Sequence, residues 1–220
     1  MLKKMQNIKP ELQVEKYPDL SGISSEDVKI IQKAISTEIV WKDLNVASMG
    51  DKEIFLDDNF KVESFYLREV FNDAVKVTVG CVTLGKGIPN LISEKMSSGE
   101  YHLAALADSY ASQYVELLAE KWFEMRKQEQ RSRGLFPTLR FSPGYGDFEL
   151  KYQKEIIHLL EMEDRIKVTD SYLLEPEKTI TFLMGWCKEP QKNIYPELAT
   201  NACPGGGNCE FCRTKACLKM

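Results

Sequence analysis

This sequence has few histidines, no excess of basic residues over acidic ones and no long apolar run. Each of these features argues against a class of protein. His102 and His158 are the only histidines among 220 residues. Neither belongs to a Ser-His-Asp or Cys-His arrangement of the kind that activates a nucleophile. We therefore identify no catalytic acid, base or nucleophile, and a conventional enzyme is the least favoured class. Whether the chain has an activity of its own stays open.

The charge balance and the hydropathy narrow the choice of partners. The formal net charge is -4 at pH 7, whereas a protein that binds nucleic acid usually carries a basic stripe. No segment approaches the roughly 18 to 20 apolar residues that a membrane helix needs. Residues 1–19 are charged and have no apolar run, unlike a secretion signal. We therefore expect a cytoplasmic protein with no nucleic-acid or membrane partner.

The hydrophobic pattern predicts several elements. Residues 1–22 are polar and contain two prolines, so we expect a loose N-terminal arm. Ser24 and Asp27 have the spacing of a capping box, which predicts a helix start. Apolar residues every three or four positions predict a long helix over 102–131, and alternation over 75–81 predicts a strand with one side buried.

The remaining segments are mixed. We expect a third helix over 148–162 and two β-rich runs, 166–174 and 179–186, joined by a hairpin or tight connection. The run Phe65–Leu67 lies in an ambiguous stretch where we expect a strand. Long helices packed on a mostly antiparallel, twisted sheet define an α+β fold.

The segment from Arg140 to Tyr145 has the parts of a small-molecule site. The planar guanidinium of Arg140 can hold a carboxylate through two parallel hydrogen bonds. Pro143 stiffens the chain, and Gly144 allows a close backbone approach or a positive φ angle. Tyr145 offers an aromatic face with a hydroxyl. The alternative is an ordinary loop, in which Arg140 pairs with a local Glu or Asp.

The order of several short segments resembles the reactivation domain of cobalamin-dependent methionine synthase. In that family an Arg-x-x-Pro-Gly-Tyr loop binds S-adenosylmethionine, and its counterpart here is Arg140–Tyr145, inside the more specific match 140–147. The resemblance covers roughly residues 75 to 187, and the family's glutamate near the ligand falls on Ser112. The other matching residues are 82–85, Ala107, Asp108, Glu116, Thr169, Asp170, Ser171, Tyr172, Leu173, Leu174, Pro176, Thr179, Ile180 and Thr181.

The resemblance implies a function. The family rescues methionine synthase after oxidation of its cobalamin, using one electron and a methyl group from S-adenosylmethionine. Arg140 would hold the ligand's carboxylate, and Pro143, Gly144 and Tyr145 would seat the rest. The partner would be a cobalamin-binding methionine synthase or related corrinoid protein, with a flavodoxin or ferredoxin as electron donor. The alternative is a docking or scaffold partner of another corrinoid methyltransferase system, without S-adenosylmethionine binding.

Six cysteines are present, and four of them crowd one end of the sequence. Their spacing, C-x5-C-x2-C-x4-C, is typical of a metal site in a cytoplasmic protein rather than of a disulfide scaffold. Four thiolates suit structural zinc and also an iron–sulfur cluster, and a thiol-bearing tail without metal is the third alternative. The clustered cysteines are Cys203, Cys209, Cys212 and Cys217, and the isolated ones are Cys81 and Cys187.

These segments suggest four parts. They are an N-terminal arm (1–22), a domain like the methionine synthase activation domain (23–187), a linker (188–202) and the cysteine-cluster tail (203–220).

Overall fold

An antiparallel sheet of seven strands forms the centre of the protein. The computed structural model describes residues 1–191. The strand order is β4-β3-β2-β5-β9-β6, with β1 paired to β2 beside β3, and every recorded pairing is antiparallel. The strands are β1 (Leu2–Gln6), β2 (Glu38–Met49), β3 (Glu53–Leu56), β4 (Lys61–Glu63), β5 (Ala74–Thr83), β6 (Phe136–Phe141) and β9 (Thr179–Cys187).

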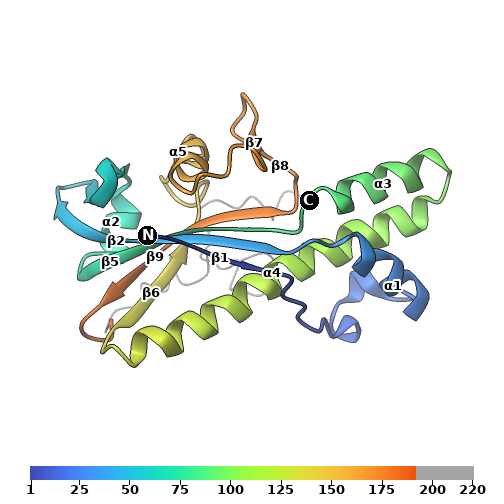
Figure 1. Cartoon of the computed structure of the whole chain (residues 1–220), viewed down its shortest axis with the longest axis horizontal. Coiled ribbons are helices and arrows are strands. Elements are labelled where there is room, and N and C mark those ends of the chain that lie inside the picture. The colour runs from blue at the N-terminus through green and yellow to red at the C-terminus, as the bar shows by residue number, and fades with distance from the viewer. Residues whose placement is uncertain (192–220) are drawn as a thin grey trace.

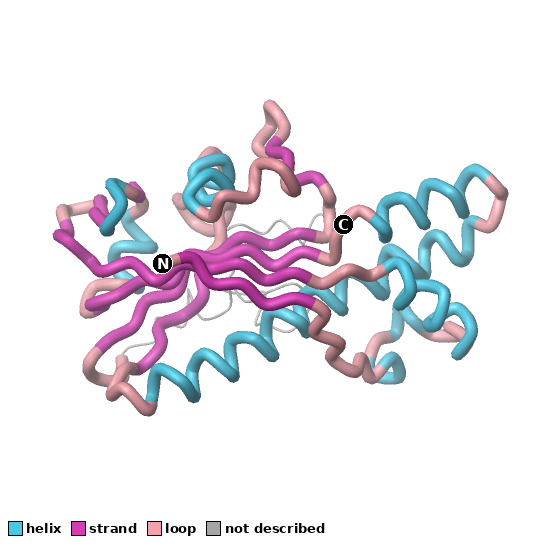
Figure 2. The backbone as a smooth tube through the Cα atoms, in the orientation of Figure 1, coloured by secondary structure: helices cyan, strands magenta, loops and turns pink. Residues whose placement is uncertain are grey.

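Helices cover both faces of this sheet, so the predicted α+β architecture is confirmed. The long helix α4 crosses one face with α1 and α3 beside it, and α5 lies over the other face (Figure 1). A small hairpin, β7 with β8, also projects from the α5 side (Figures 1 and 2). The bounds are α1 (Ser25–Ala34), α2 (Phe65–Val70), α3 (Gly87–Ser97), α4 (Tyr101–Arg131), α5 (Tyr152–Leu159), β7 (Lys167–Val168) and β8 (Leu174–Glu175).

The central strands β5 and β9 are buried on both faces. Val77 and Val79 of β5 belong to the core under α5, whereas Phe182 of β9 belongs to the core under α4. The prediction that only one side of the 75–81 strand is buried was therefore wrong. Gly80 leaves room for Phe182, because a Cβ there would lie 2.3 Å from the ring atom Cζ.

Local signals located the helices on the α4 side well. The predicted capping box is present, since the Ser24 hydroxyl accepts from the Asp27 N–H at 3.0 Å and the Asp27 carboxylate accepts from the Ser24 N–H. Helix α4 begins one residue before the predicted start and ends at the predicted Arg131.

Several other expectations need correction. Residues 1–22 are not loose: β1 pairs with β2, and Leu12 and Leu20 are buried in the core under α4. The run Phe65–Leu67 begins helix α2 rather than a strand. The third helix is shorter than predicted, Tyr152–Leu159. The two β-rich runs do not pair with each other, because β8 pairs with β7 and β9 joins the main sheet.

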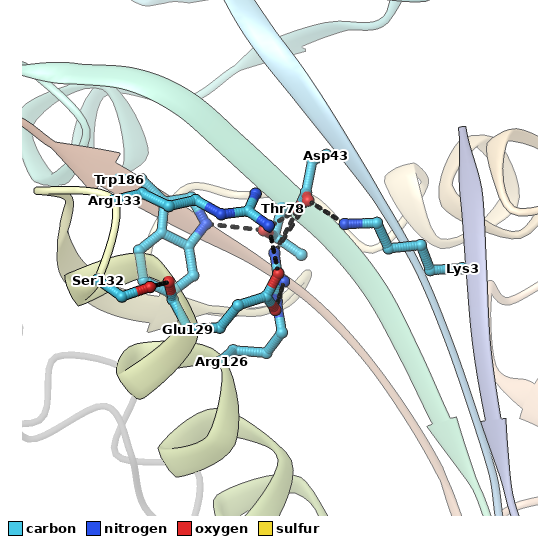
Figure 3. Close-up of polar contacts among 8 residues, drawn as sticks. All are labelled: Lys3, Asp43, Thr78, Arg126, Glu129, Ser132, Arg133 and Trp186. Atoms are coloured by element: carbon cyan, nitrogen blue, oxygen red, sulfur yellow. Dashed lines mark hydrogen bonds and ion pairs between the residues drawn. The ribbon is translucent and has the colours of Figure 1, made fainter.

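A buried ion pair ties the end of α4 to the sheet (Figure 3). Arg126 Nη2 donates to both carboxylate oxygens of Asp43, at 2.8 and 2.9 Å, and Arg126 also pairs with Glu129. The Thr78 hydroxyl donates to Asp43 at 2.6 Å and accepts from the indole N–H of Trp186 at 2.7 Å. One network therefore joins β2, β5, β9 and α4.

Candidate functional site

Arg140 lies on the edge strand β6 and points toward α4. Its register partner in β9 is Met184, and its neighbour Phe141 faces the opposite core, under α5. Arg140 Nη2 donates to Glu116 Oε2 at 2.9 Å, and the guanidinium lies 5.1 Å from the ring centroid of Phe123. The strand's alternation therefore presents the guanidinium to the helix and anchors its neighbour in the core.

One end of the Arg140 guanidinium is unused. Its Nη1 is buried and has no hydrogen-bond partner within residues 1–191. A buried donor without an acceptor is costly, because it has lost water and gained nothing in exchange. Arg140 does pair with a carboxylate, as the ordinary-loop interpretation expects, but Glu116 is 24 residues away and fills only the other end.

A polar row on α4 faces this region. Asp108, Ser112 and Glu116 are spaced by four residues and so share one side of the helix. Lys178, just before β9, reaches Asp108 at 2.7 Å and Ser112 at 2.9 Å. The row is thus flanked by two cations, Lys178 and Arg140. Sequence reasoning missed Lys178, although the spacing of the row was visible.

The loop after β6 does not bring the Tyr145 ring to Arg140. The ring packs edge-on against Phe141, with centroids 6.1 Å apart, on the α5 side of the sheet. Pro143 is buried and Gly144 is exposed, with φ of +95°. The Gly144 N–H donates to the carbonyl of Phe148 at 2.6 Å. The exposed backbone at Gly144 therefore lies in the loop that follows the edge strand β6.

The second half of the matched segment locks the loop onto α2. The Asp147 carboxylate accepts from the N–H groups of Phe65 at 2.7 Å and Tyr66 at 3.2 Å. These are the first free donors of helix α2, which an acidic group stabilises. Gly146 has φ of +57°, and a Cβ there would lie 2.9 Å from a ring carbon of Tyr66. Packing explains Gly146 and Asp147 without a ligand.

The Thr169–Tyr172 segment forms the turn of the β7–β8 hairpin. The Thr169 N–H donates to the carbonyl of Leu173 at 2.9 Å, and the Leu173 N–H donates to the Thr169 hydroxyl at 3.0 Å. Tyr172 has φ of +62° and is 40% exposed at the tip. This segment of the family resemblance therefore corresponds to a turn that holds itself.

The cysteine-cluster residues Cys203, Cys209, Cys212 and Cys217 lie outside the described residues, and so does most of the predicted linker. Within residues 1–191 no group of three or more His, Cys, Asp or Glu is arranged to hold a metal. Burial raises the pKa of the Cys81 thiol, and it raises that of Cys187 to about 11.

Within residues 1–191 no helix is long and apolar enough to span a bilayer.

Comparison with solved structures identifies the fold. The chain is similar to the crystal structure of the MetH reactivation domain bound to AdoHcy, with a TM-score of 0.61 and 14% sequence identity. The match covers 89% of this chain and 80% of that one. No protein-family description and no curated protein matched the sequence. The shared feature is thus the architecture: helices packed on a mostly antiparallel sheet, as in the MetH reactivation domain.

Proposed function

We propose that this chain binds S-adenosylmethionine beside Arg140 and is an accessory protein for a cobalamin-dependent methionine synthase. The observation that carries the proposal is the buried, unpartnered Nη1 of Arg140, next to Glu116. The fold supports it, since the similar MetH reactivation domain was crystallised with AdoHcy. The matched loop residues Pro143, Gly144 and Tyr145 belong to the proposed site.

Arg140 and Glu116 together suit the amino-acid end of the ligand. S-adenosylmethionine carries a carboxylate and an ammonium group on one carbon, so it needs a cation and an anion side by side. The free Nη1 of Arg140 would donate to the carboxylate, and Glu116, whose side chain is 27% exposed, would accept from the ammonium. Because both groups are already paired with each other, they are oriented before the ligand arrives.

The rest of the ligand is assigned to the edge of the sheet. Gly144 is exposed there; its positive φ favours glycine, which has no side chain to cover the backbone. Pro143 holds this backbone in place from its buried position. Tyr145 supports it from the other side, through its ring contact with Phe141.

The chain's contribution to reactivation is placement. The reaction takes one electron from a donor such as flavodoxin or ferredoxin and the methyl group of S-adenosylmethionine. It converts the partner's cob(II)alamin to methylcobalamin and releases S-adenosylhomocysteine. No acid or base on this chain is required, because the methyl group is transferred directly to cobalt. Holding the sulfonium in line with a docked partner replaces a rare encounter by an oriented one.

The test is calorimetric titration of the full chain with S-adenosylmethionine. Arg140→Ala and Glu116→Gln should each weaken binding about tenfold or more, since each removes one charge-assisted contact. Arg133→Ala is the matched control, because Arg133 is a half-exposed arginine that pairs with Glu129 at 2.9 Å. It should bind as the unchanged protein does.

Two outcomes would contradict this proposal. One is the absence of binding in the unchanged protein, which would favour a docking partner of a corrinoid protein that has no ligand of its own. The other is full binding by Arg140→Ala, which would locate the ligand elsewhere. Co-purification of the chain with a cobalamin-binding domain separates the docking role from ligand binding, since docking should survive Arg140→Ala.

We also propose a metal at the four clustered cysteines, zinc or an iron–sulfur cluster. The spacing of Cys209 and Cys212 supports it, because two cysteines separated by two residues form a common two-ligand turn. Elemental analysis of the anaerobically purified chain should find zinc, or iron with acid-labile sulfide. Cys209→Ser should lose the metal and Cys81→Ser should keep it. A metal-free preparation of the unchanged chain would contradict the proposal.

A further inference from the structure

A cavity lies on the other side of α4 from Arg140. Its volume is about 210 Å³, and Tyr114 contributes to its lining. Tyr114 and Glu116 are two residues apart on the helix, so they point in nearly opposite directions. The cavity also borders the segment after β1, the end of α1 and the start of β2. Its polar lining residues are Asn7, Lys9, Glu11, Gln32, Thr37 and Tyr114.

Tyr114, a largely buried residue, lines this cavity. The residue is 2% exposed, and its ring stacks on Tyr110 with centroids 5.7 Å apart. The Tyr110 hydroxyl accepts from the Gln32 amide at 2.9 Å, whereas the Tyr114 hydroxyl has no hydrogen bond to the described residues. Burial raises the pKa of Tyr114 to about 12, so the group is neutral and can both donate and accept.

Two residues of opposite charge line the cavity. Lys9 and Glu11 both line it and both are exposed, and neither forms an ion pair within the part of the chain that the structure describes. Thr37 uses its hydroxyl hydrogen on the carbonyl of Ile8 at 2.8 Å and keeps its oxygen as an acceptor. Pro10 and Ile35 add apolar surface. The lining therefore combines a cation, an anion, a neutral hydroxyl and an apolar wall.

A larger cavity shows the contrast. It has a volume of about 600 Å³ and is also lined by charged residues, and most of them form ion pairs, Lys86 and Glu177 excepted. Lys167 pairs with Glu175 at 3.5 Å, and Arg165 pairs with Asp164 at 3.0 Å. A ligand bound at Lys167 or Arg165 would have to compete with an ion pair, whereas both charges that line the cavity at Tyr114, Lys9 and Glu11, have no ion pair among the described residues.

We propose that the cavity at Tyr114 is a binding site for a free amino acid. Lys9 would receive the carboxylate, Glu11 the ammonium, and the Tyr114 hydroxyl would bond to a polar atom at the cavity floor. The side chain of the ligand would lie against Pro10 and Ile35. The volume supports a ligand of this size, since it is below the roughly 300 to 1,000 Å³ typical of sites for larger metabolites and cofactors.

The experiment screens the full chain against the twenty common L-amino acids by ligand-observed NMR, followed by calorimetry on the best binder. The N-acetyl and amide derivatives of that amino acid each remove one charge, and each should bind about tenfold more weakly or worse. Tyr114→Phe should weaken binding about fivefold, the typical loss for one neutral hydrogen bond. Tyr101→Phe, at an exposed position on the same helix, is the matched control and should change nothing.

Three results would overturn the proposal. They are no binding by any of the twenty amino acids, undiminished binding of both derivatives, or identical behaviour of Tyr114→Phe and Tyr101→Phe. Arg140→Ala distinguishes this site from the one proposed for S-adenosylmethionine, because it should leave amino-acid binding intact. Loss of amino-acid binding in Arg140→Ala would assign the ligand to the other side of α4.

Discussion

Two arginines are held between α4 and the sheet, and their surroundings differ. The side chain of Arg126 is 3% exposed and that of Arg140 is 13% exposed. Arg126 meets two carboxylates and lies within 6 Å of three tryptophan rings, Trp41, Trp122 and Trp186. Arg140 meets one carboxylate and one aromatic ring, and its Nη1 has no partner within residues 1–191.

The difference assigns Arg126 a structural role and supports the ligand-binding role that we propose for Arg140. Both charges are costly to bury, and a partner must compensate for the loss of water. The guanidinium of Arg126 meets a carboxylate at each of its two Nη atoms, and only its buried Nε has no hydrogen-bond partner among the described residues. That of Arg140 is compensated only in part, which leaves a directed donor at the edge of the sheet. Arg126 ties α4 to the sheet, whereas Arg140 is the arginine at which we propose that a ligand binds.

The strongest test of this comparison is stability. Arg126→Met should lower the free energy of unfolding by about 3 to 5 kcal/mol, because the buried carboxylate of Asp43 loses the guanidinium and keeps only the Thr78 hydroxyl and Lys3. Arg140→Met should cost only about 1 to 2 kcal/mol, since Glu116 is partly exposed and can turn toward water. Urea denaturation followed by circular dichroism measures both changes.

A double variant checks the assignment. Asp43→Asn combined with Arg126→Met removes both charges, so it should be more stable than the sum of the two single changes predicts. The comparison fails if Arg140→Met destabilises the protein as much as Arg126→Met. It also fails if the two changes at Asp43 and Arg126 are additive.

Sequence patterns predicted what depends on neighbours along the chain. The capping box at Ser24 needs only Asp27, and α4 needs only its apolar spacing, so both were visible. Helix α2 was missed although Ser64 caps it locally, accepting from the Leu67 N–H at 3.0 Å; its first two N–H groups bond to Asp147, more than eighty residues away. Strand β1 was hidden for the same reason. Its residues are mostly polar, and it is held by long-range contacts with β2. These are the backbone pairing of the two strands and the ion pair between Lys3 and Asp43, at 3.1 Å.

The candidate site shows the same limit. The resemblance marked both Arg140 and Glu116, but no pattern showed that the two face each other. The position of Tyr145 was equally hidden. Alternation along β6 puts Arg140 and Phe141 on opposite faces, and the following loop carries Tyr145 back to the side of Phe141. These positions depend on how the strands pair and where the loop turns, and the periodicity of the sequence does not show either.

The smallest expected effect is on the acid stability of the Arg126 network. Burial alone would raise the pKa of Asp43, but the Thr78 hydroxyl, the Arg126 guanidinium and Lys3 together lower it below its usual value. A lowered pKa means that the stabilisation is fully present above the unfolded value of about 3.9 and is lost as the pH falls through the folded value. Asp43→Asn lacks this titration.

The stability difference between the unchanged protein and Asp43→Asn should therefore be constant near neutral pH and shrink below about pH 4. Urea unfolding at a series of pH values measures it. Glu116→Gln is the matched variant, because it removes the carboxylate beside Arg140, for which no such buried network exists among the described residues. The stability difference between the unchanged protein and Glu116→Gln should not shrink in acid in this way. If it does, the two arginine sites have similar electrostatics, and the deeper burial of Arg126 does not distinguish them.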